Sequence, residues 1–474
     1  MKRNLLLLVL AVIFLMPAFG QKKSNYELKF EFDHYSNDTL LLAYFYGDKQ
    51  LIKDTILAQP GKKFVYSGTD TLDAGIYILM FFPDKKFIQF IINDQEKFFT
   101  IKGDYKDLSS LKFKGSKDNE LFYTYMDFLS EKREIADTLN AHRKKAVEFR
   151  QDTTAIDLQL KELEMNVLAY QNDLVQKNPE SITALMLLGN KDIDIPALDV
   201  AAEELQRARF YYYRKHFFDH IDFSNPALIR TPFLYNKIER YLDQLTVQIP
   251  DTISQTIDEI LLKMEPANET WKFYVSHFLN KYAKSLVIGM DAVYVHMVDQ
   301  YYSKGRTTWV AKETLEKIID NAEKLRPTLL GKIAEDVTLY TEDKQPVRIH
   351  DIQSDYLVLF FWAPDCGHCK QSMPDIVKFS EKFKDKGVKV VAVCTKGRDK
   401  VAECWDFVKE KNMGVFYYNL TDELYRSRYH VKYDVRTTPK VFILDKDKKI
   451  ILKNVAGEKL DEVMTEVMKN DGKM

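Results

Sequence analysis

The sequence predicts three domains in succession: an antiparallel β domain, an all-helical domain and a C-terminal α/β/α domain. Three patterns indicate this order. Apolar residues alternate with polar ones near the N-terminus, recur at helical spacing in the middle, and form buried strands separated by helical stretches at the end. A length of 474 residues fits about three domains, and an apolar content of 46% is ample for their cores.

We place these domains at residues 24–115, 118–326 and 330–474, behind a leader at residues 1–20. The leader joins a basic start to an apolar run and a small-residue end, which is typical of a cleaved secretory signal. An uncleaved anchor is the alternative, but the apolar run is short for a membrane span. No cysteine follows the run, so we expect a soluble periplasmic protein without a lipid anchor.

The β domain begins with strict apolar alternation from Tyr26 to Phe32. Further apolar runs follow, separated by turn signals such as Pro60-Gly61 and Gly103-Asp104. This spacing favours an antiparallel sandwich or barrel. The domain contains no catalytic constellation, and its role stays open.

Helical spacing takes over at Asp118, and the charged stretches 131–150 and 156–176 are expected to pack as helical hairpins. His216 and His220 lie four residues apart, which could place two imidazoles on one helix face. A zinc site needs a third or fourth ligand, so we predict no metal there.

In the last domain, strands and helices alternate behind a short leading hairpin at 337–349. The expected strands are 357–362, 388–393, 416–418, 441–444 and 450–453, and the expected helices are 366–383, 401–411, 422–429 and a closing helix. This order predicts a three-layer α/β/α sandwich. We expect Pro374 to bend or locally break the first of these helices, because proline has no N–H to donate.

The one strong chemical signal is Cys366-Gly367-His368-Cys369, which joins the buried strand 357–362 to a helix start. A cysteine at a helix N-terminus is favoured as a thiolate by the unpaired backbone N–H groups and the helix dipole. Cys369 lies one turn further along and is placed to attack a mixed disulfide formed at Cys366.

With F-W-A-x-x-C-x-x-C-K at residues 361–370 and Pro374 five residues after the second cysteine, the chain resembles the thioredoxin superfamily. Thr438-Pro439, followed by an apolar strand, is similar to the cis-proline loop of that family. The extra segment 400–418 resembles the insertion of periplasmic TlpA/ResA-type members, and the β domain resembles one that precedes many Bacteroidetes-type relatives. The resemblance covers about residues 330–469 and implies a thioredoxin fold there.

The resemblance implies a role for each residue of the motif. Cys366 is expected to be the nucleophile and Cys369 the resolving cysteine. The expected redox-tuning residues are His368, Gly367 and Asp365, and the expected substrate-binding residues are Thr438, Pro439 and Trp362. A histidine between the cysteines stabilises the thiolate, whereas an ionised Asp365 opposes it, so the redox poise stays open.

Two positions depart from the family pattern. Phe360 stands where thioredoxin has a buried aspartate, and Ser372 stands where ResA-like members have a glutamate. The proton acceptor for Cys369 is therefore unidentified, with Asp375, Glu381 or water as candidates.

Cys394 ends an apolar strand, and Cys404 falls on the inserted helix. Either they are buried, inert thiols, or they pair as a structural disulfide in an oxidising compartment. Zinc binding by all four cysteines would require the motif pair to leave its helix, so we disfavour it.

We therefore predict a periplasmic thiol-disulfide oxidoreductase, acting as a reductase recharged by a membrane electron donor or as an isomerase or oxidase. One alternative is a binding or scaffold protein with an accessory thioredoxin domain. The other is a peroxidase, which is disfavoured because the P-x-x-x-T-x-x-C pattern of such enzymes does not surround Cys366. No cofactor is implied beyond the dithiol itself. The expected partners are periplasmic proteins with disulfides or dithiols, and a second copy of the chain; a net charge of −1 argues against nucleic acid.

Overall fold

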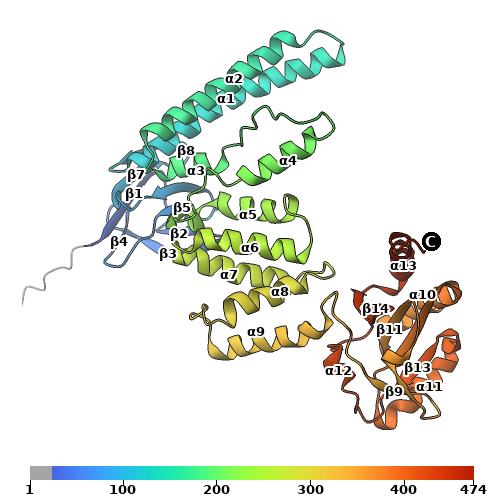
Figure 1. The fold of residues 1–474 in the computed structure, drawn as a ribbon. Helices are drawn as coiled ribbons and strands as arrows, with labels where there is room; N and C mark the ends of the chain where they lie inside the picture. The colour runs from blue at the N-terminus through green and yellow to red at the C-terminus, as the bar shows by residue number, and fades with distance from the viewer. Residues whose placement is uncertain (1–23, 474) are drawn as a thin grey trace, which may run out of the picture. The chain divides into compact units, whose positions relative to one another are not determined.

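The computed structural model describes residues 24–473 and divides into two compact units, Met1–Glu239 and Arg240–Met474 (Figure 1). The predicted leader at residues 1–20 lies outside the described residues. The unit boundary falls inside helix α5 (Pro232–Gln244), so the helices of the predicted middle domain are shared between the two units. Across residues 24–473, no helix combines the length and the apolar character needed to cross a membrane.

The first unit begins with an eight-stranded sheet in the order β6-β5-β2-β3-β4-β1-β7-β8. The strands are β1 (Tyr26–Asp33), β2 (Thr39–Tyr46), β3 (Lys49–Gln59), β4 (Lys63–Gly68), β5 (Gly75–Phe81), β6 (Phe87–Ile92), β7 (Phe98–Asp104) and β8 (Asp107–Lys114). The prediction of an antiparallel domain is wrong for one pair, because β1 and β7 run parallel. That pairing joins strands far apart in sequence, which alternation alone does not reveal.

The sheet curls so that both of its halves face one core. Phe90 of β6 lies with its ring centroid 5.7 Å from that of Phe30 on β1 and 6.1 Å from that of Phe99 on β7. The alternate residues of these strands are buried because successive side chains of a strand point to opposite faces. The apolar alternation of these strands therefore fills an aromatic core inside the curled sheet.

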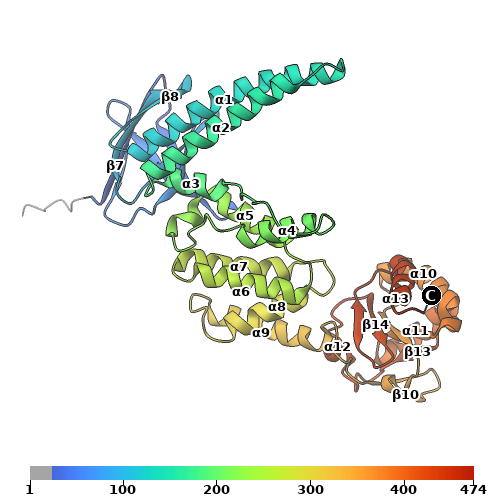
Figure 2. The same cartoon turned by 45° about the horizontal axis from the view of Figure 1, so that its top comes forward.

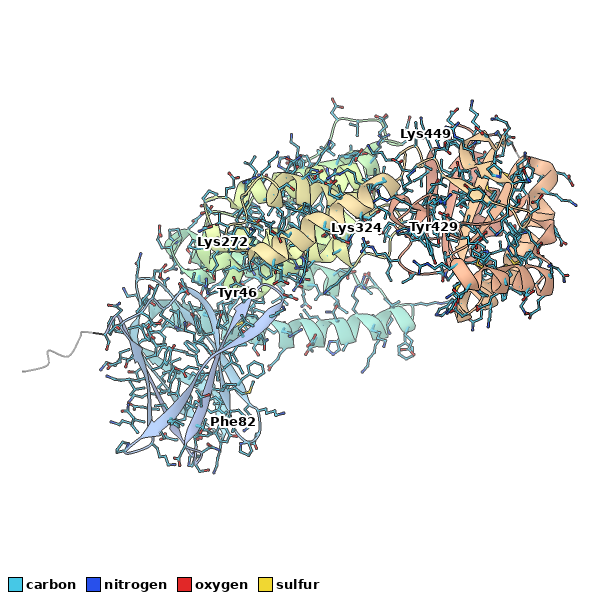
Figure 3. All side chains as sticks on the ribbon, turned by 90° about the horizontal axis from the view of Figure 1, so that it is seen from below. Tyr46, Phe82, Lys272, Lys324, Tyr429 and Lys449 are labelled. Carbon is cyan, nitrogen blue, oxygen red and sulfur yellow. A yellow bond between two sulfur atoms is a disulfide. The ribbon has the colours of Figure 1, made fainter. Side chains whose placement is uncertain are left out.

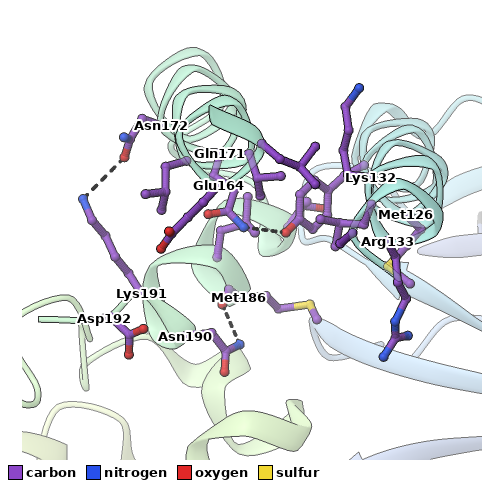
Figure 4. A pocket seen from close by; sticks show the side chains of 18 of the residues that line it. Met126, Lys132, Arg133, Glu164, Gln171, Asn172, Met186, Asn190, Lys191 and Asp192 are labelled. Atoms are coloured by element: carbon purple, nitrogen blue, oxygen red, sulfur yellow. Dashed lines mark hydrogen bonds between the residues drawn. The ribbon is translucent and has the colours of Figure 1, made fainter. Parts of the chain in front are cut away.

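Helices α1 (Lys117–Glu148) and α2 (Thr154–Lys177) run side by side as a hairpin and are followed by α3 (Ile182–Asn190) and α4 (Leu205–His216) (Figure 1, Figure 2). Between α1, α2 and α3 lies a half-open cavity of about 830 Å³, along whose wall Gln171 donates to the Tyr125 hydroxyl at 2.8 Å (Figure 4). None of the candidate site residues lines this cavity.

The second unit contains helices α6 (Pro250–Met264), α7 (Asn268–Ala283), α8 (Asp291–Met297) and α9 (Lys312–Leu325). Short helical turns lie at η1 (Pro226–Arg230) in the first unit and at η2 (Val298–Tyr302) and η3 (Arg326–Thr328) in the second. Asp258 on α6 accepts hydrogen bonds from His296 Nε2 at 2.9 Å and from the Tyr301 hydroxyl at 2.7 Å. Burial alone would raise the pKa of Asp258, but these hydrogen bonds outweigh it and hold that pKa below its ordinary value.

The C-terminal part is a seven-stranded sheet in the order β10-β9-β13-β12-β11-β14-β15. Its strands are β9 (Thr338–Tyr340), β10 (Pro346–Arg348), β11 (Tyr356–Trp362), β12 (Val388–Cys394), β13 (Tyr418–Thr421), β14 (Lys440–Asp445) and β15 (Ile450–Lys453). Its helices are α10 (Gly367–Phe383), α11 (Val401–Glu410), α12 (Tyr429–Lys432) and α13 (Leu460–Asn470), with short turns η4 (Ile349–Asp351), η5 (Lys384–Lys386), η6 (Arg398–Lys400), η7 (Met413–Val415) and η8 (Gly457–Lys459). The helix α10 continues through Pro374 and is not broken there.

Strand β11 is buried on both faces, and the two faces are covered differently. Phe360 and its alternate neighbours pack with residues of α10, α11 and α13. Phe361 packs against Tyr429 of the four-residue α12, with ring centroids 5.6 Å apart, and against irregular segments (Figure 3 labels Tyr429). One face of the sheet is thus covered by three helices, and the other by one short helix and irregular segments.

The predicted helix at 422–429 is wrong, and a loop stands in its place. The Asp422 carboxylate accepts the backbone N–H groups of Arg426 at 3.0 Å and Ser427 at 2.8 Å, which satisfies them without a helix. Tyr425 and Arg428 have positive φ angles of 53° and 57°, which no α-helix accommodates.

Lys453 of β15 joins the sheet to the helices of the same unit. Its side chain is 5% exposed, pairs with the Asp291 carboxylate of α8, and donates to the Thr328 carbonyl at 2.7 Å. A buried ammonium without such partners would be strongly destabilising, so this contact fixes the sheet against α8.

Candidate active site

The candidate site lies at the edge of the sheet where three parallel strands end. Strands β11, β12 and β13 are parallel, so the residues that follow them emerge at the same edge. These are Cys366 after β11, Lys396 after β12 and the loop 422–428 after β13. Strand β14 is antiparallel to β11 and starts opposite Phe361, which brings Pro439 to the same edge.

Cys366 is the N-cap residue of α10, and its sulfur accepts the backbone N–H of Cys369 at 3.1 Å. Cys366 is half-buried, whereas Cys369 is fully buried, and the two form a disulfide with a Cα–Cα distance of 5.2 Å. A sulfur that caps a helix receives N–H groups that stabilise its thiolate. The geometry makes Cys366 the cysteine that a substrate can reach.

The Thr438-Pro439 peptide bond is cis, as the resemblance implied. The Thr438 carbonyl oxygen lies 3.3 Å from Cys366 Sγ. In the reduced protein the Cys366 thiol is in position to donate to this carbonyl, a weak hydrogen bond for sulfur. Thr438 and Pro439 are half-buried, and the Thr438 carbonyl borders the sulfur.

Asp365, directly before Cys366, is not an isolated anion. Lys396 Nζ lies 2.6 Å from its carboxylate, and the Lys396 side chain is 24% exposed. The hydrogen bond from Lys396 holds the pKa of Asp365 below its usual value. Asp365 is therefore ionised at neutral pH, and the charge of Lys396 balances its negative charge. Sequence reasoning missed Lys396; its position after the end of a parallel strand neighbouring β11 was the available signal.

The remaining predicted site residues differ in their exposure to solvent. His368 and Gly367 are exposed at the start of α10, open to a substrate. Trp362 is 1% exposed and packs on Phe407 of α11, with ring centroids 4.9 Å apart, so the prediction that it binds substrate is wrong. The inserted helix α11 covers this tryptophan.

Helix geometry separates two proposed proton acceptors from Cys369. Glu381 lies twelve residues further along α10, about 18 Å at the usual rise of a helix, and Asp375 lies six residues along, about 9 Å. Ser372 donates its hydroxyl to the His368 carbonyl at 2.8 Å, within the helix. Of the three candidates, helix geometry leaves only water.

The second pair of cysteines is joined as a disulfide. Cys394, at the end of β12, and Cys404, on α11, have Cα atoms 6.2 Å apart, and both are fully buried. The bond closes the segment that carries Lys396. Within residues 24–473, no group of three or more histidine, cysteine or acidic side chains is arranged to hold a metal ion.

Comparison with known families gives matches to all three regions. The family profile described as Redoxin matches residues 329–468. Two profiles described as domains of unknown function, DUF5106 and DUF4369, match residues 170–327 and 26–122.

Individual relatives each match part of the chain. The chain is 26% identical over 141 residues to the thiol-disulfide oxidoreductase ResA of Bacillus thuringiensis subsp. konkukian, which covers 30% of this chain and 77% of that protein. A domain of a possible thiol-disulfide isomerase from Cytophaga hutchinsonii is 31% identical, with 31% of this chain and 97% of that chain covered and a TM-score of 0.28. A thioredoxin-like protein from Bacteroides caccae is 18% identical, with 58% and 98% covered and a TM-score of 0.43.

A disulfide at a helix N-terminus after a central strand, facing a cis-proline, defines a thioredoxin-like thiol-disulfide oxidoreductase. Within that class, the C-terminal domain makes the chain a TlpA/ResA-like member of the thioredoxin superfamily.

Proposed function

We propose that this protein reduces disulfide bonds of other proteins in an extracytoplasmic compartment. The observation that carries the proposal is the half-buried Cys366 sulfur at the start of α10, next to the Thr438 carbonyl and backed by the buried Cys369. One sulfur can meet a bulky substrate, and the other can act only on a bond already formed at the first.

The proposed reaction has two exchange steps. The Cys366 thiolate attacks one sulfur of the substrate disulfide, forming a mixed disulfide and releasing the other substrate sulfur as a thiolate, which takes up a proton. The Cys369 thiol loses its proton to water, and its thiolate attacks Cys366 Sγ, releasing the second substrate thiolate. Two electrons pass to the substrate, and the Cys366–Cys369 disulfide must then be reduced by an external dithiol donor, which we expect at the membrane.

The Cys394–Cys404 disulfide supports the proposed compartment. Structural disulfides form and persist outside the reducing cytosol. The predicted leader at residues 1–20 points the same way. Fractionation of cells, with alkylation of free thiols before lysis, tests the location: a cytosolic protein with reduced Cys394 and Cys404 would contradict it.

The reduction potential of the Cys366–Cys369 pair, measured in glutathione or dithiothreitol buffers, tests the direction. A reductase is expected near the thioredoxin value of roughly −270 mV, whereas roughly −120 to −180 mV would indicate an oxidase or isomerase. A Cys369→Ser variant incubated with an extracytoplasmic extract should accumulate mixed disulfides with substrate proteins, and a Cys366→Ser variant should not. If neither exchange nor trapping occurs, a binding role for the chain replaces the oxidoreductase proposal.

A further inference from the structure

The loop 422–428, which replaces the predicted helix after β13, has a fixed conformation. Its Asp422 is 1% exposed, and besides two backbone N–H groups it accepts the Ser427 hydroxyl at 2.6 Å. The Glu423 carbonyl accepts the Arg398 N–H at 2.9 Å, and its carboxylate pairs with Lys344 at 2.6 Å. Side-chain and backbone contacts therefore fix the loop from both sides.

This rigid loop exposes two large apolar side chains. Leu424 is 58% exposed and Tyr425 is 38% exposed. Tyr425 also has a φ of 53°, a conformation that is costly for a bulky residue and persists only where the surroundings enforce it. Packing of the hydrophobic core therefore does not explain the strained conformation of this exposed tyrosine.

The loop is continuous with the active site. The Tyr425 ring packs on Gly397, where an added Cβ would lie 2.7 Å from the ring, and the Tyr425 hydroxyl donates to the Thr395 carbonyl at 3.4 Å. Between these two residues stands Lys396, the partner of Asp365 beside Cys366. Strand β13 is two strands from β11, about 10 Å at the usual strand spacing.

We infer that Leu424 and Tyr425 form a contact for an apolar side chain of the substrate polypeptide, about three residues from its reacting cysteine. Three residues of extended chain span about 10 Å, the distance between the ends of β11 and β13. The occupant is an extended or unfolded segment of a substrate protein, because its cysteine must reach Cys366 while its neighbour reaches the loop. The inference rests on the proposed function and adds substrate selectivity to it.

The test uses the reduced full chain and two synthetic peptides joined by a disulfide to a fluorescence quencher. One has the sequence Leu-Gly-Ser-Cys-Ser-Gly-Leu, and the other has Ser in place of both Leu residues. Burial of one apolar side chain in a binding contact changes kcat/KM by about tenfold, so the Leu peptide should react about ten times faster. In Leu424→Ser and in Tyr425→Ser, the ratio of the two rates should fall toward one.

Two variants serve as controls. Val431→Ser changes another exposed apolar residue of the same domain, 42% exposed on α12, and should keep the tenfold ratio. Leu424→Met keeps an apolar side chain at this position and should retain most of the tenfold ratio. A ratio near one in the unmodified protein, or a ratio unchanged in Leu424→Ser, overturns the inference. Oxidised glutathione serves as a small disulfide in parallel: if it and both peptides fail to react, the proposed function itself has failed.

Discussion

Replacing Lys396 by Met removes the cation that pairs with Asp365 beside the reactive cysteine. The Asp365 carboxylate then stands next to Cys366 without its ion-pair partner, which disfavours the thiolate. The pKa of the Cys366 thiol should rise. The reduction potential of the pair should become more negative, because the reduced form loses part of its stabilisation.

The structure bounds the size of this effect. Asp365 and Cys366 are adjacent, so the carboxylate lies roughly two residue spacings, about 8 Å, from the sulfur. At that distance two unit charges interact by about 0.5 kcal/mol in water and about 2 kcal/mol at an effective dielectric constant near 20. The Asp365 side chain is 63% exposed, so solvent screening favours the lower part of that range. About 0.5–1 kcal/mol corresponds to roughly half a pKa unit and about 10–20 mV.

The assay is a glutathione titration of the full chain, with the Cys366 pKa followed by thiolate ultraviolet absorbance. Asp365→Asn should shift both quantities in the opposite direction, and the Asp365→Asn/Lys396→Met double variant should return close to the unmodified protein. Lys378→Met, an exposed lysine on α10, is the matched control. An unchanged or less negative potential in Lys396→Met would refute the electrostatic argument.

Three further predictions concern stability and are followed by tryptophan fluorescence, since all four tryptophans lie within residues 240–474. Replacing the buried Lys453 by Met should cost about 3 kcal/mol by leaving its carboxylate partner unpaired, whereas the exposed Lys446→Met should cost almost nothing; equal effects would contradict the buried pair. Replacing Cys394 and Cys404 together by Ala should cost about 2.7 kcal/mol, the loop-closure value for a separation of 10 residues, and a variant as stable as the parent would argue against the disulfide. The pKa of Asp258 is lower in the folded protein than in the unfolded chain, so its ionised form stabilises the fold at pH values above the unfolded pKa of about 3.9, and this contribution is lost as pH falls through the folded pKa. Asp258→Asn should therefore reduce stability at pH 7 and flatten the decline of stability in acid. Parallel curves of stability against pH for the two proteins would exclude this role.

The helix that carries Cys366 was predictable because its signals are local. The apolar run before the motif and the helical spacing after it lie within one stretch of sequence, and β11 and α10 form there. The loop 422–428 was mistaken for a helix because its conformation depends on the buried Asp422, whose hydrogen bonds compete with the helical ones. Spacing of apolar residues does not report such competition.

Other features depend on contacts between distant segments. Lys396 meets Asp365 only because β12 pairs with β11 in parallel, and the Cys394–Cys404 bond requires a Cα–Cα distance that spacing does not supply. The burial of Trp362 likewise follows from the position of α11, an insertion relative to a minimal thioredoxin. Family resemblance identified the insertion but not the side chain that it covers.

The two disulfides differ in access to solvent, and this gives the protein a simple chemical signature. The chain has four cysteines, all paired, with one half-buried sulfur in the first bond and none exposed in the second. A mild reductant added to the folded protein should release two thiols, and the other two should appear only after unfolding. The fold thus allows the first disulfide to be reduced and reoxidised while the second stays oxidised in the same solution. This difference comes from physical access to the sulfurs rather than from the strength of the reductant.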